Sequence, residues 1–227
     1  MGTWPTACTA SVWKNTPFSL HTLPISAMGI MVPTSLFANI TDTSTVLSLI
    51  RDSSKNNIFP VGRLDKDTEG LLIITNDGAL SHDLLAPGKH VWKTYFVRVR
   101  GILEDKEISC LENGLDIGEE KPTRPAKVRL LKTEELSLLP DDPGYPEDGQ
   151  CCLELSICEG RFHQVKRMLA AVGHPVLYLK RLSMGSLQLD KSLAPGEYRR
   201  LTGEEIDALR EDGDLYEKKS VYEKMDI

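Results

Sequence analysis

The chain has 227 residues, with 27 Lys and Arg against 33 Asp and Glu, and its net charge is −6. Its 41% hydrophobic and 26% charged residues are typical of a folded protein and exclude a disordered or fibrous chain. Five cysteines without a CxxC pair argue against a zinc ribbon or a disulfide scaffold, and no uncharged run is apolar enough to predict a membrane span.

The first 44 residues differ from the rest, with one charged residue before Asp42 and no sustained helical or strand period. We expect 1–44 to be an atypical segment, either disordered or altered in its reading frame. The pattern then predicts a helix-like turn at 45–50, a strand at 71–75 closed by the turn at 76–78, a short helix at 80–85 and an alternating strand at 93–100.

Residues 104–150 are acidic, with one predicted strand at 127–131 and a loop at 140–149. The second half predicts a strand at 152–157, a helix at 163–172 ended by Gly173, strands at 176–182 and 197–201, and a helix opened by the capping box at 202–205. That helix should end near residue 211, leaving 211–227 as a frayed acidic tail. The irregular alternation predicts an α+β fold, with a mostly antiparallel central sheet flanked by helices.

Basic residues are concentrated in one part of the chain. Residues 160–200 carry eight Lys and Arg but two acids, whereas residues 102–150 carry six bases and thirteen acids. Binding to a polyanion depends on such local charge more than on net charge. The basic stretch therefore fits either an RNA-contacting surface or an exposed face balanced by nearby acids.

Two acids stand out in the segment FPVGRLDKDTEGLLIITNDG at 59–78, where Asp65 and Asp67 lie between a glycine and an apolar strand. The spacing fits a metal site, a phosphotransfer nucleophile or a carboxylate nucleophile that needs no metal. Glu69 stands where the phosphotransfer pattern usually has Thr or Val, which disfavours the second interpretation. A purely structural role, in which either acid caps a turn, fits as well.

GRLDKDTEGLLIITNDG resembles the signature of the RNA pseudouridine synthases, and within them the bacterial small-subunit pseudouridine synthase A type. Three further segments match that family in order: KTY at 93–95, EGRFHQVKRM at 159–168 and LAPGEYRRL at 193–201. The resemblance runs from about Thr45 to Leu209, so we interpret 45–210 as the catalytic domain.

The resemblance implies that a uridine within RNA is isomerised to pseudouridine, a reaction that needs no cofactor and no metal. It implies that Asp65 is the nucleophile, attacking ribose C1′ or uracil C6, and that Lys166 is its ion-pair partner. Tyr95 would stack on the target base and accept the proton from C5. Arg63 would help to hold the flipped-out nucleotide.

The basic stretch then becomes a predicted RNA-contacting surface. Its expected contacts are Arg161, His163, Gln164, Arg167, Lys180 and Arg181, with the basic side chains on phosphates.

Two features depart from the family. The Lys-Pro pair that usually opens the first strand is absent from the corresponding residues 28–40, and the segment before it is too short and charge-poor for an S4-like RNA-binding domain. We hypothesise that residues 1 to about 42 come from a shifted reading frame or a misplaced start, which would leave the sheet without a first strand. Sequencing the locus tests this, because an intact frame would refute it.

Taken together, the sequence predicts a cytoplasmic, monomeric enzyme that acts on ribosomal RNA, chiefly 16S, or on a ribosome assembly intermediate. The alternatives are a 23S-specific synthase, a non-catalytic RNA-binding or ribosome-assembly protein with the same fold, and a metal-dependent phosphohydrolase that uses Asp65 and Asp67.

Overall fold

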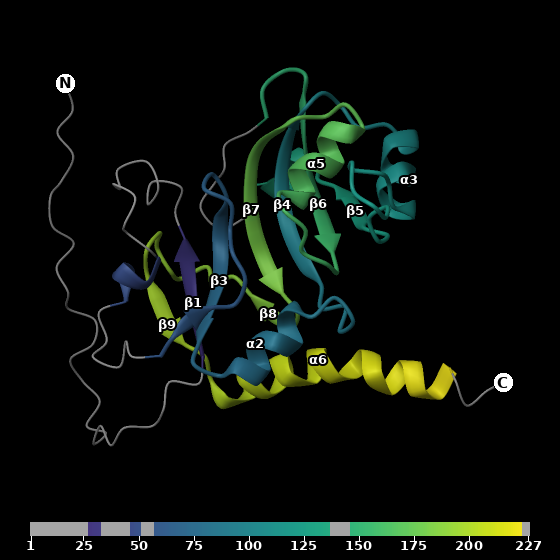
Figure 1. The fold of residues 1–227 in the computed structure, drawn as a ribbon. Helices are drawn as coiled ribbons and strands as arrows, with labels where there is room; N and C mark the ends of the chain where they lie inside the picture. Colours follow the sequence, from purple (N-terminus) through teal and green to yellow (C-terminus); the bar gives the residue numbers. More distant parts are fainter. Residues whose placement is uncertain (1–26, 33–45, 51–56, 137–145, 224–227) are drawn as a thin grey trace, which may run out of the picture.

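The computed structural model of the chain describes residues 27–32, 46–50, 57–136 and 146–223 (Figure 1). Its strands are β1 (Ala27–Val32), β2 (Phe59–Pro60), β3 (Glu69–Thr75), β4 (Lys93–Arg100), β5 (Lys127–Leu130), β6 (Gln150–Ile157), β7 (Val176–Met184), β8 (Leu187–Gln188) and β9 (Tyr198–Arg200). Its helices are the 3-10 helix η1 (Val46–Leu49), α2 (Gly78–Leu85), α3 (Asp105–Asn113), α4 (Thr133–Leu136), α5 (Gln164–Ala171) and α6 (Gly203–Glu223).

All nine described strands belong to one sheet, in the order β5-β6-β4-β7-β3-β1-β9, with β2 beside β3 and β8 beside β7. Among the described pairs, β3–β7 alone is parallel. The predicted α+β fold with a mostly antiparallel sheet is therefore confirmed.

The alternating segment at 93–100 forms β4 with the predicted bounds. Tyr95, Val97 and Val99 point into a hydrophobic cluster beneath α3 and α5, whereas Phe96 faces the opposite side, with Leu136. This alternation is what a strand buried on both faces requires, since successive side chains point to opposite sides.

Helices α3 and α5 of one half and α2 and α6 of the other lie on the same face of the sheet. Lys93 and Tyr95 are two residues apart on β4 and so share a face. Lys93 is opposite Met184, which belongs to the cluster under α2 and α6, while Tyr95 belongs to the cluster under α3 and α5. The two helical groups therefore stand side by side over one sheet, and the space between them opens above β4 and β7 (Figure 1).

The two halves of the sheet meet where β3 runs beside β7, and Gly70 makes this approach possible. Gly70 is opposite Arg181 and has a φ of +103°. A Cβ atom at this position would lie 2.3 Å from the carbonyl oxygen of Arg181, well inside van der Waals contact. Only glycine accepts both this backbone conformation and this contact.

Two expectations from the sequence are wrong, the missing first strand and the frayed end after residue 211, and one helix was not predicted. The first strand is present, because β1 pairs with β3 on one side and β9 on the other. A helix, α3, begins in the acidic segment, where Glu104 and Glu107 form a capping box. The last helix continues to Glu223, so residues 211–223 are not a frayed tail. The predicted loop at 140–149 falls largely outside the described residues, as does most of the 1–44 segment.

Asp77 fixes the start of α2. Its Oδ1 accepts hydrogen bonds from the backbone N–H groups of Ala79 (3.0 Å) and Leu80 (3.1 Å), and the bond from Leu80 is the largest cause that lowers its pKa. We expect Asp77→Ala to lower the free energy of unfolding by about 1 kcal/mol in urea titrations.

Arg210→Ala is the matched control, because it removes exposed ion pairs with Asp77 and Asp207 but leaves the cap, and should change the free energy of unfolding by less than about 0.5 kcal/mol. Equal effects of the two variants would contradict the capping role.

Candidate active site

Asp65 lies in the loop between β2 and β3. The backbone N–H of Thr68 donates to the carbonyl oxygen of Asp65 at 2.9 Å and closes a turn, and the Asp65 side chain remains 25% exposed. The turn therefore presents this carboxylate at the surface of a cleft without burying it.

A cation from the other half of the sheet meets Asp65. Lys166, in the first turn of α5, places Nζ 3.3 Å from Oδ2 of Asp65 and also contacts Oδ1 of Asp67. The hydrogen bond from Lys166 lowers the pKa of Asp67. His163 Nε2 lies 3.7 Å from Oδ1 of Asp65. The structure thus joins the predicted nucleophile, Asp65, and its predicted partner, Lys166, although they lie far apart in the chain. Lys166 is 99 residues from the neighbouring Asp67.

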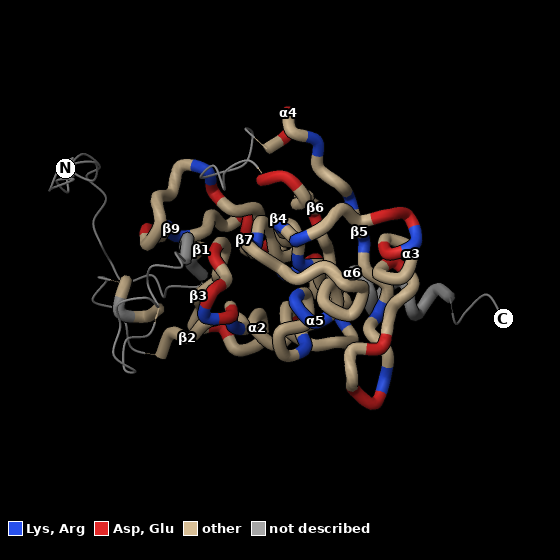
Figure 2. Tube along the Cα trace, turned by 90° about the horizontal axis from the view of Figure 1, so that it is seen from above, with Lys and Arg blue, Asp and Glu red and all other residues tan. Residues whose placement is uncertain are grey.

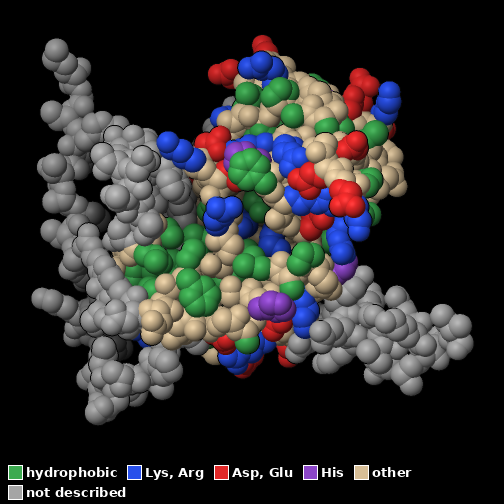
Figure 3. Space-filling model, in the orientation of Figure 1, with side chains coloured by type: hydrophobic (Ala, Val, Ile, Leu, Met, Phe, Trp, Pro, Cys, Tyr) green, Lys and Arg blue, Asp and Glu red, His purple; other side chains and the backbone are tan. Residues whose placement is uncertain are grey.

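A cavity of about 500 Å³ adjoins Asp65, a size suited to a small organic ligand. Its walls come from both halves of the sheet: residues 62–66 and 68, Leu85 of α2, Lys93 and Tyr95 of β4, Ile157, residues 160–165, and Leu179 and Arg181 of β7. The space-filling view shows the molecule hollowed between an upper and a lower part, with basic side chains gathered there (Figure 3).

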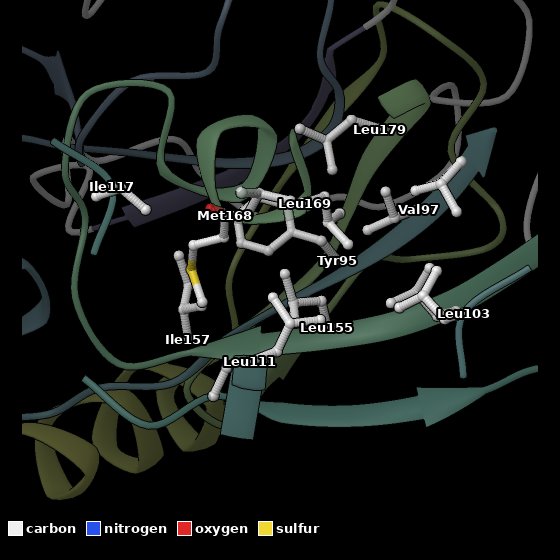
Figure 4. Packing of buried hydrophobic residues seen from close by; sticks show 14 residues of the cluster. Tyr95, Val97, Leu103, Leu111, Ile117, Leu155, Ile157, Met168, Leu169 and Leu179 are labelled. Carbon is white, nitrogen blue, oxygen red and sulfur yellow. The ribbon is translucent and has the colours of Figure 1, made fainter. Parts of the chain in front are cut away.

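Tyr95 is both a core residue and a wall of this cavity. It is 9% exposed and belongs to the cluster of Met168 and Leu169, beside which its ring lies in Figure 4. The same residue lines the cavity and is opposite Arg181 across β4 and β7. An aromatic side chain held so firmly can receive a planar base without rearrangement.

Arg161 and Arg167, which were predicted to contact phosphates, both have their guanidinium groups engaged within the protein in this structure. Both form ion pairs with Glu119. Arg161 also donates to the carbonyl oxygens of Lys121 and Pro122, at 2.6 and 2.7 Å. These contacts hold the 158–163 loop against the acidic segment, and the view from above shows the basic positions of α5 near the middle of the molecule (Figure 2).

Burial also argues against RNA contacts for Gln164 and Lys180, which are 3% and 1% exposed. Gln164 Nε2 donates to Glu159 at 2.7 Å, and the same carboxylate accepts from Arg161 Nε at 3.2 Å. Gln164 and Glu159 therefore shape the loop that carries His163. Arg181 is 2% exposed but lines the cavity, and Arg63 is exposed at its rim, so both remain within reach of a bound nucleotide.

Phe162 is a feature of the site that the sequence analysis missed. Its ring is 68% exposed, lines the cavity and stacks on the imidazole of His163 with centroids 3.9 Å apart. His163 has a left-handed backbone conformation, with a φ of +49°, at the start of α5. The sequence signal that could have identified Phe162 was its position directly before His163 in the segment EGRFHQVKRM.

Lys93 is a second buried cation of the cavity wall. It is 5% exposed, and Nζ donates to the carbonyl oxygens of Val91 (3.0 Å) and Leu84 (3.4 Å). Burial, reinforced by the charge of Arg181, lowers its pKa to about 8.

This pKa predicts how stability depends on pH. An unfolded lysine titrates near pH 10.4. Between about pH 8 and that value the folded state binds fewer protons than the unfolded state, so the free energy of unfolding rises with pH. Relative to Lys93→Met, the wild type should gain up to about 1.4 kcal/mol per pH unit across this window. Urea titrations from pH 7 to 10 measure the difference, and a constant difference would contradict the shift.

The two carboxylates of the loop share an ammonium group as their cation, which is the geometry of an ion-paired nucleophile. Among the residues that the structure describes, no cluster of three or more His, Cys, Asp or Glu is arranged to hold a metal ion. No helix in that part of the chain is long and apolar enough to cross a bilayer.

Comparison with known proteins identifies the family of the chain. The sequence model of the RNA pseudouridylate synthase family matches residues 28–171, which include β1. The chain is 50% identical over 153 residues to an uncharacterized RNA pseudouridine synthase of Bacillus subtilis, covering 67% of this chain and 59% of that protein. It is 39% identical over 169 residues to the ribosomal small subunit pseudouridine synthase A of Haemophilus influenzae, covering 74% of this chain and 66% of that protein.

The chain thus spans about three fifths to two thirds of the length of these relatives. A crystal structure of a pseudouridylate synthase superimposes with a TM-score of 0.66 at 34% identity, covering 81% of this chain and 73% of that one. The family match covers more than half of the chain and includes Asp65, Tyr95 and Lys166. The chain therefore belongs to the RNA pseudouridylate synthase family.

Proposed function

We propose that this protein isomerises a uridine of 16S ribosomal RNA to pseudouridine, with Asp65 as the nucleophile. The observation that carries the proposal is the Asp65–Lys166 ion pair at the wall of a cavity that also contains Tyr95. The choice of the small subunit rests on the relatives named for it, at about two fifths identity.

The arrangement suits a nucleotide that has left its base stack. The cavity lies between the loop of Asp65 and the start of α5, and Tyr95 supplies an aromatic wall for the base. Extruding a base costs a few kcal/mol, which contacts in the pocket must offset. Exposed Arg63 and Phe162 at the rim would hold the backbone and stack on an adjacent base.

The reaction then needs no group beyond these side chains. Asp65 bonds to C1′ or to C6, the glycosidic bond breaks, and the base turns and rejoins the ribose through C5. The bond to Asp65 breaks again, displaced from C1′ by C5 or eliminated from C6, so that the carboxylate is regenerated. C5 loses its proton, for which Tyr95 is the proposed acceptor, and N1 gains one. The ammonium of Lys166 holds the Asp65 carboxylate in place and balances its charge.

A tritium-release assay tests the proposal. Transcripts of 16S and 23S ribosomal RNA labelled with 5-tritiated uridine are incubated with the purified chain, and tritium in water is counted. We expect release from the 16S transcript approaching one uridine per molecule, at a position then mapped by carbodiimide modification.

The other outcomes separate the alternatives. Release from 23S RNA alone would reassign the substrate to the large subunit. Binding of either RNA without any release would favour the non-catalytic RNA-binding protein and contradict the proposal.

A further inference from the structure

Two buried polar atoms without a hydrogen-bond partner face the same space. They are Nη2 of Arg181 and Oγ1 of Thr68, and both residues line the cavity beside Asp65. A buried donor left without a partner costs about 1–3 kcal/mol. Natural proteins keep few such groups, and a catalytic role at the site is one of the reasons for which they do.

Arg181 is held rigidly at the floor of the cavity. It is 2% exposed, and its Nε donates to the carbonyl oxygen of Leu71 at 2.7 Å. Its position opposite Tyr95 in the β4–β7 register places the two side chains next to each other on one face of the sheet. The guanidinium group is therefore fixed beside the ring that would form the base-binding wall.

This floor is positively charged. The other buried cation is Lys93, whose charge acts on Arg181 across the cavity wall. None of the carboxylates in the described part of the chain forms an ion pair with Arg181. A buried arginine without an anionic partner is expensive, which indicates that negative charge arrives with the ligand or develops on it.

We propose that Nη2 of Arg181 donates a hydrogen bond to O4 of the uracil and stabilises the negative charge that this oxygen acquires during the reaction. This inference rests on the proposed function, and it assigns to Arg181 a role that differs from phosphate binding.

O4 is the relevant atom because it gains charge by either route. If Asp65 attacks C1′, the C1′–N1 bond breaks and its electron pair remains on the base, shared by O2 and O4. If Asp65 adds to C6, an O–C6 bond forms and the C5=C6 pair moves through C5 and C4 onto O4. In both cases the charge is lost again when C5 bonds to C1′, the bond from Asp65 to C1′ or C6 breaks, C5 releases its proton and N1 takes one up.

A fixed donor that is itself only 2% exposed is well suited to this charge. Removing one such donor from an enzyme typically lowers kcat by 10²–10³-fold. We therefore expect Arg181→Met to lower kcat on the uridine transcript by roughly 10²-fold, while KM changes by less than about threefold.

Substrate analogues test the identity of the contacted atom. The mapped target uridine is replaced by 4-thiouridine, whose sulfur is a weak acceptor, or by 2-thiouridine, which keeps O4. The loss caused by Arg181→Met should persist with 2-thiouridine and shrink to less than about tenfold with 4-thiouridine. An equal loss with all three substrates would overturn the proposal.

Two further variants guard against a change in folding. Arg98→Met is the matched control, because Arg98 lies on the opposite face of the sheet, with its guanidinium 5.8 Å from the centre of the Tyr178 ring, and should leave the analogue pattern unchanged. Arg181→Lys keeps the charge and should show the same dependence on O4 with a smaller loss.

If Arg181→Met does not fold, as judged by circular dichroism, the analogue series with Arg181→Lys decides the question by the same criterion. Wild-type turnover on the uridine transcript separates the two proposals: its absence contradicts the function itself. If the wild type turns over but the loss of kcat caused by Arg181→Met is the same with and without O4, only the role assigned to Arg181 is contradicted.

Discussion

Asp65→Asn is expected to reduce turnover by at least ~10³-fold, to the background of the tritium-release assay. An amide of the same shape cannot form the covalent bond that the proposed reaction begins with. The side chain is only partly buried and makes a single close ion pair, so the fold should be retained. The measurement is single-turnover tritium release with enzyme in excess, alongside a circular dichroism spectrum of the variant.

Asp67→Asn is the matched control for Asp65. The two acids are two residues apart and both contact Lys166, but the Asp67 side chain is 75% exposed and does not line the cavity. We expect this variant to lose less than about tenfold in rate. If Asp67→Asn were the inactive variant and Asp65→Asn the active one, the nucleophile would be misassigned.

Lys166→Met is expected to lower kcat by about 10²-fold. The methionine fills a similar volume but leaves Asp65 without the ammonium that lies 3.3 Å from its Oδ2. A carboxylate that can rotate away from the reactive position loses the benefit of orientation, which alone is worth several kcal/mol in enzymes. Single-turnover rates at saturating RNA measure this loss separately from binding.

Lys166→Arg tests whether any positive charge beside Asp65 is sufficient for turnover. It should recover most of the rate, since a guanidinium can also pair with a carboxylate. Loss of RNA binding without loss of single-turnover rate would instead assign Lys166 to the substrate backbone and contradict its role beside Asp65.

The sequence predicted the fold well where the signal was local, either strict alternation along a strand or a residue that ends a helix. The strand at 93–100 has its predicted bounds, and the glycine at 173 ends the helix as expected, with a φ of +88°. It failed for β1, whose run AMGIMV does not alternate between apolar and polar residues. It also failed for α3, where acidic residues are as numerous as apolar ones and Leu111 alone is buried, so the amphipathic pattern is weak.

The site was predicted by family resemblance rather than by spacing. No local pattern relates Asp65 to Lys166, because they approach only once β3 and β7 have paired. For the same reason the partner of the basic stretch could not be predicted. Glu119, which pairs with Arg161 and Arg167, lies 42 and 48 residues before them in the chain. The RNA contacts of this stretch stay a prediction.

Gly70 makes the Asp65–Lys166 ion pair dependent on a residue that belongs to neither partner. β3 follows the loop of Asp65, β7 follows the helix of Lys166, and the two strands share two register pairs. A methyl group at position 70 would have to move from 2.3 Å to an ordinary contact of 3.4–4 Å from Arg181, and the strands would separate accordingly. Since the carboxylate and the ammonium are themselves 3.3 Å apart, such a separation would suffice to part them. An alanine here would therefore resemble an active-site lesion in assays while touching no reacting atom.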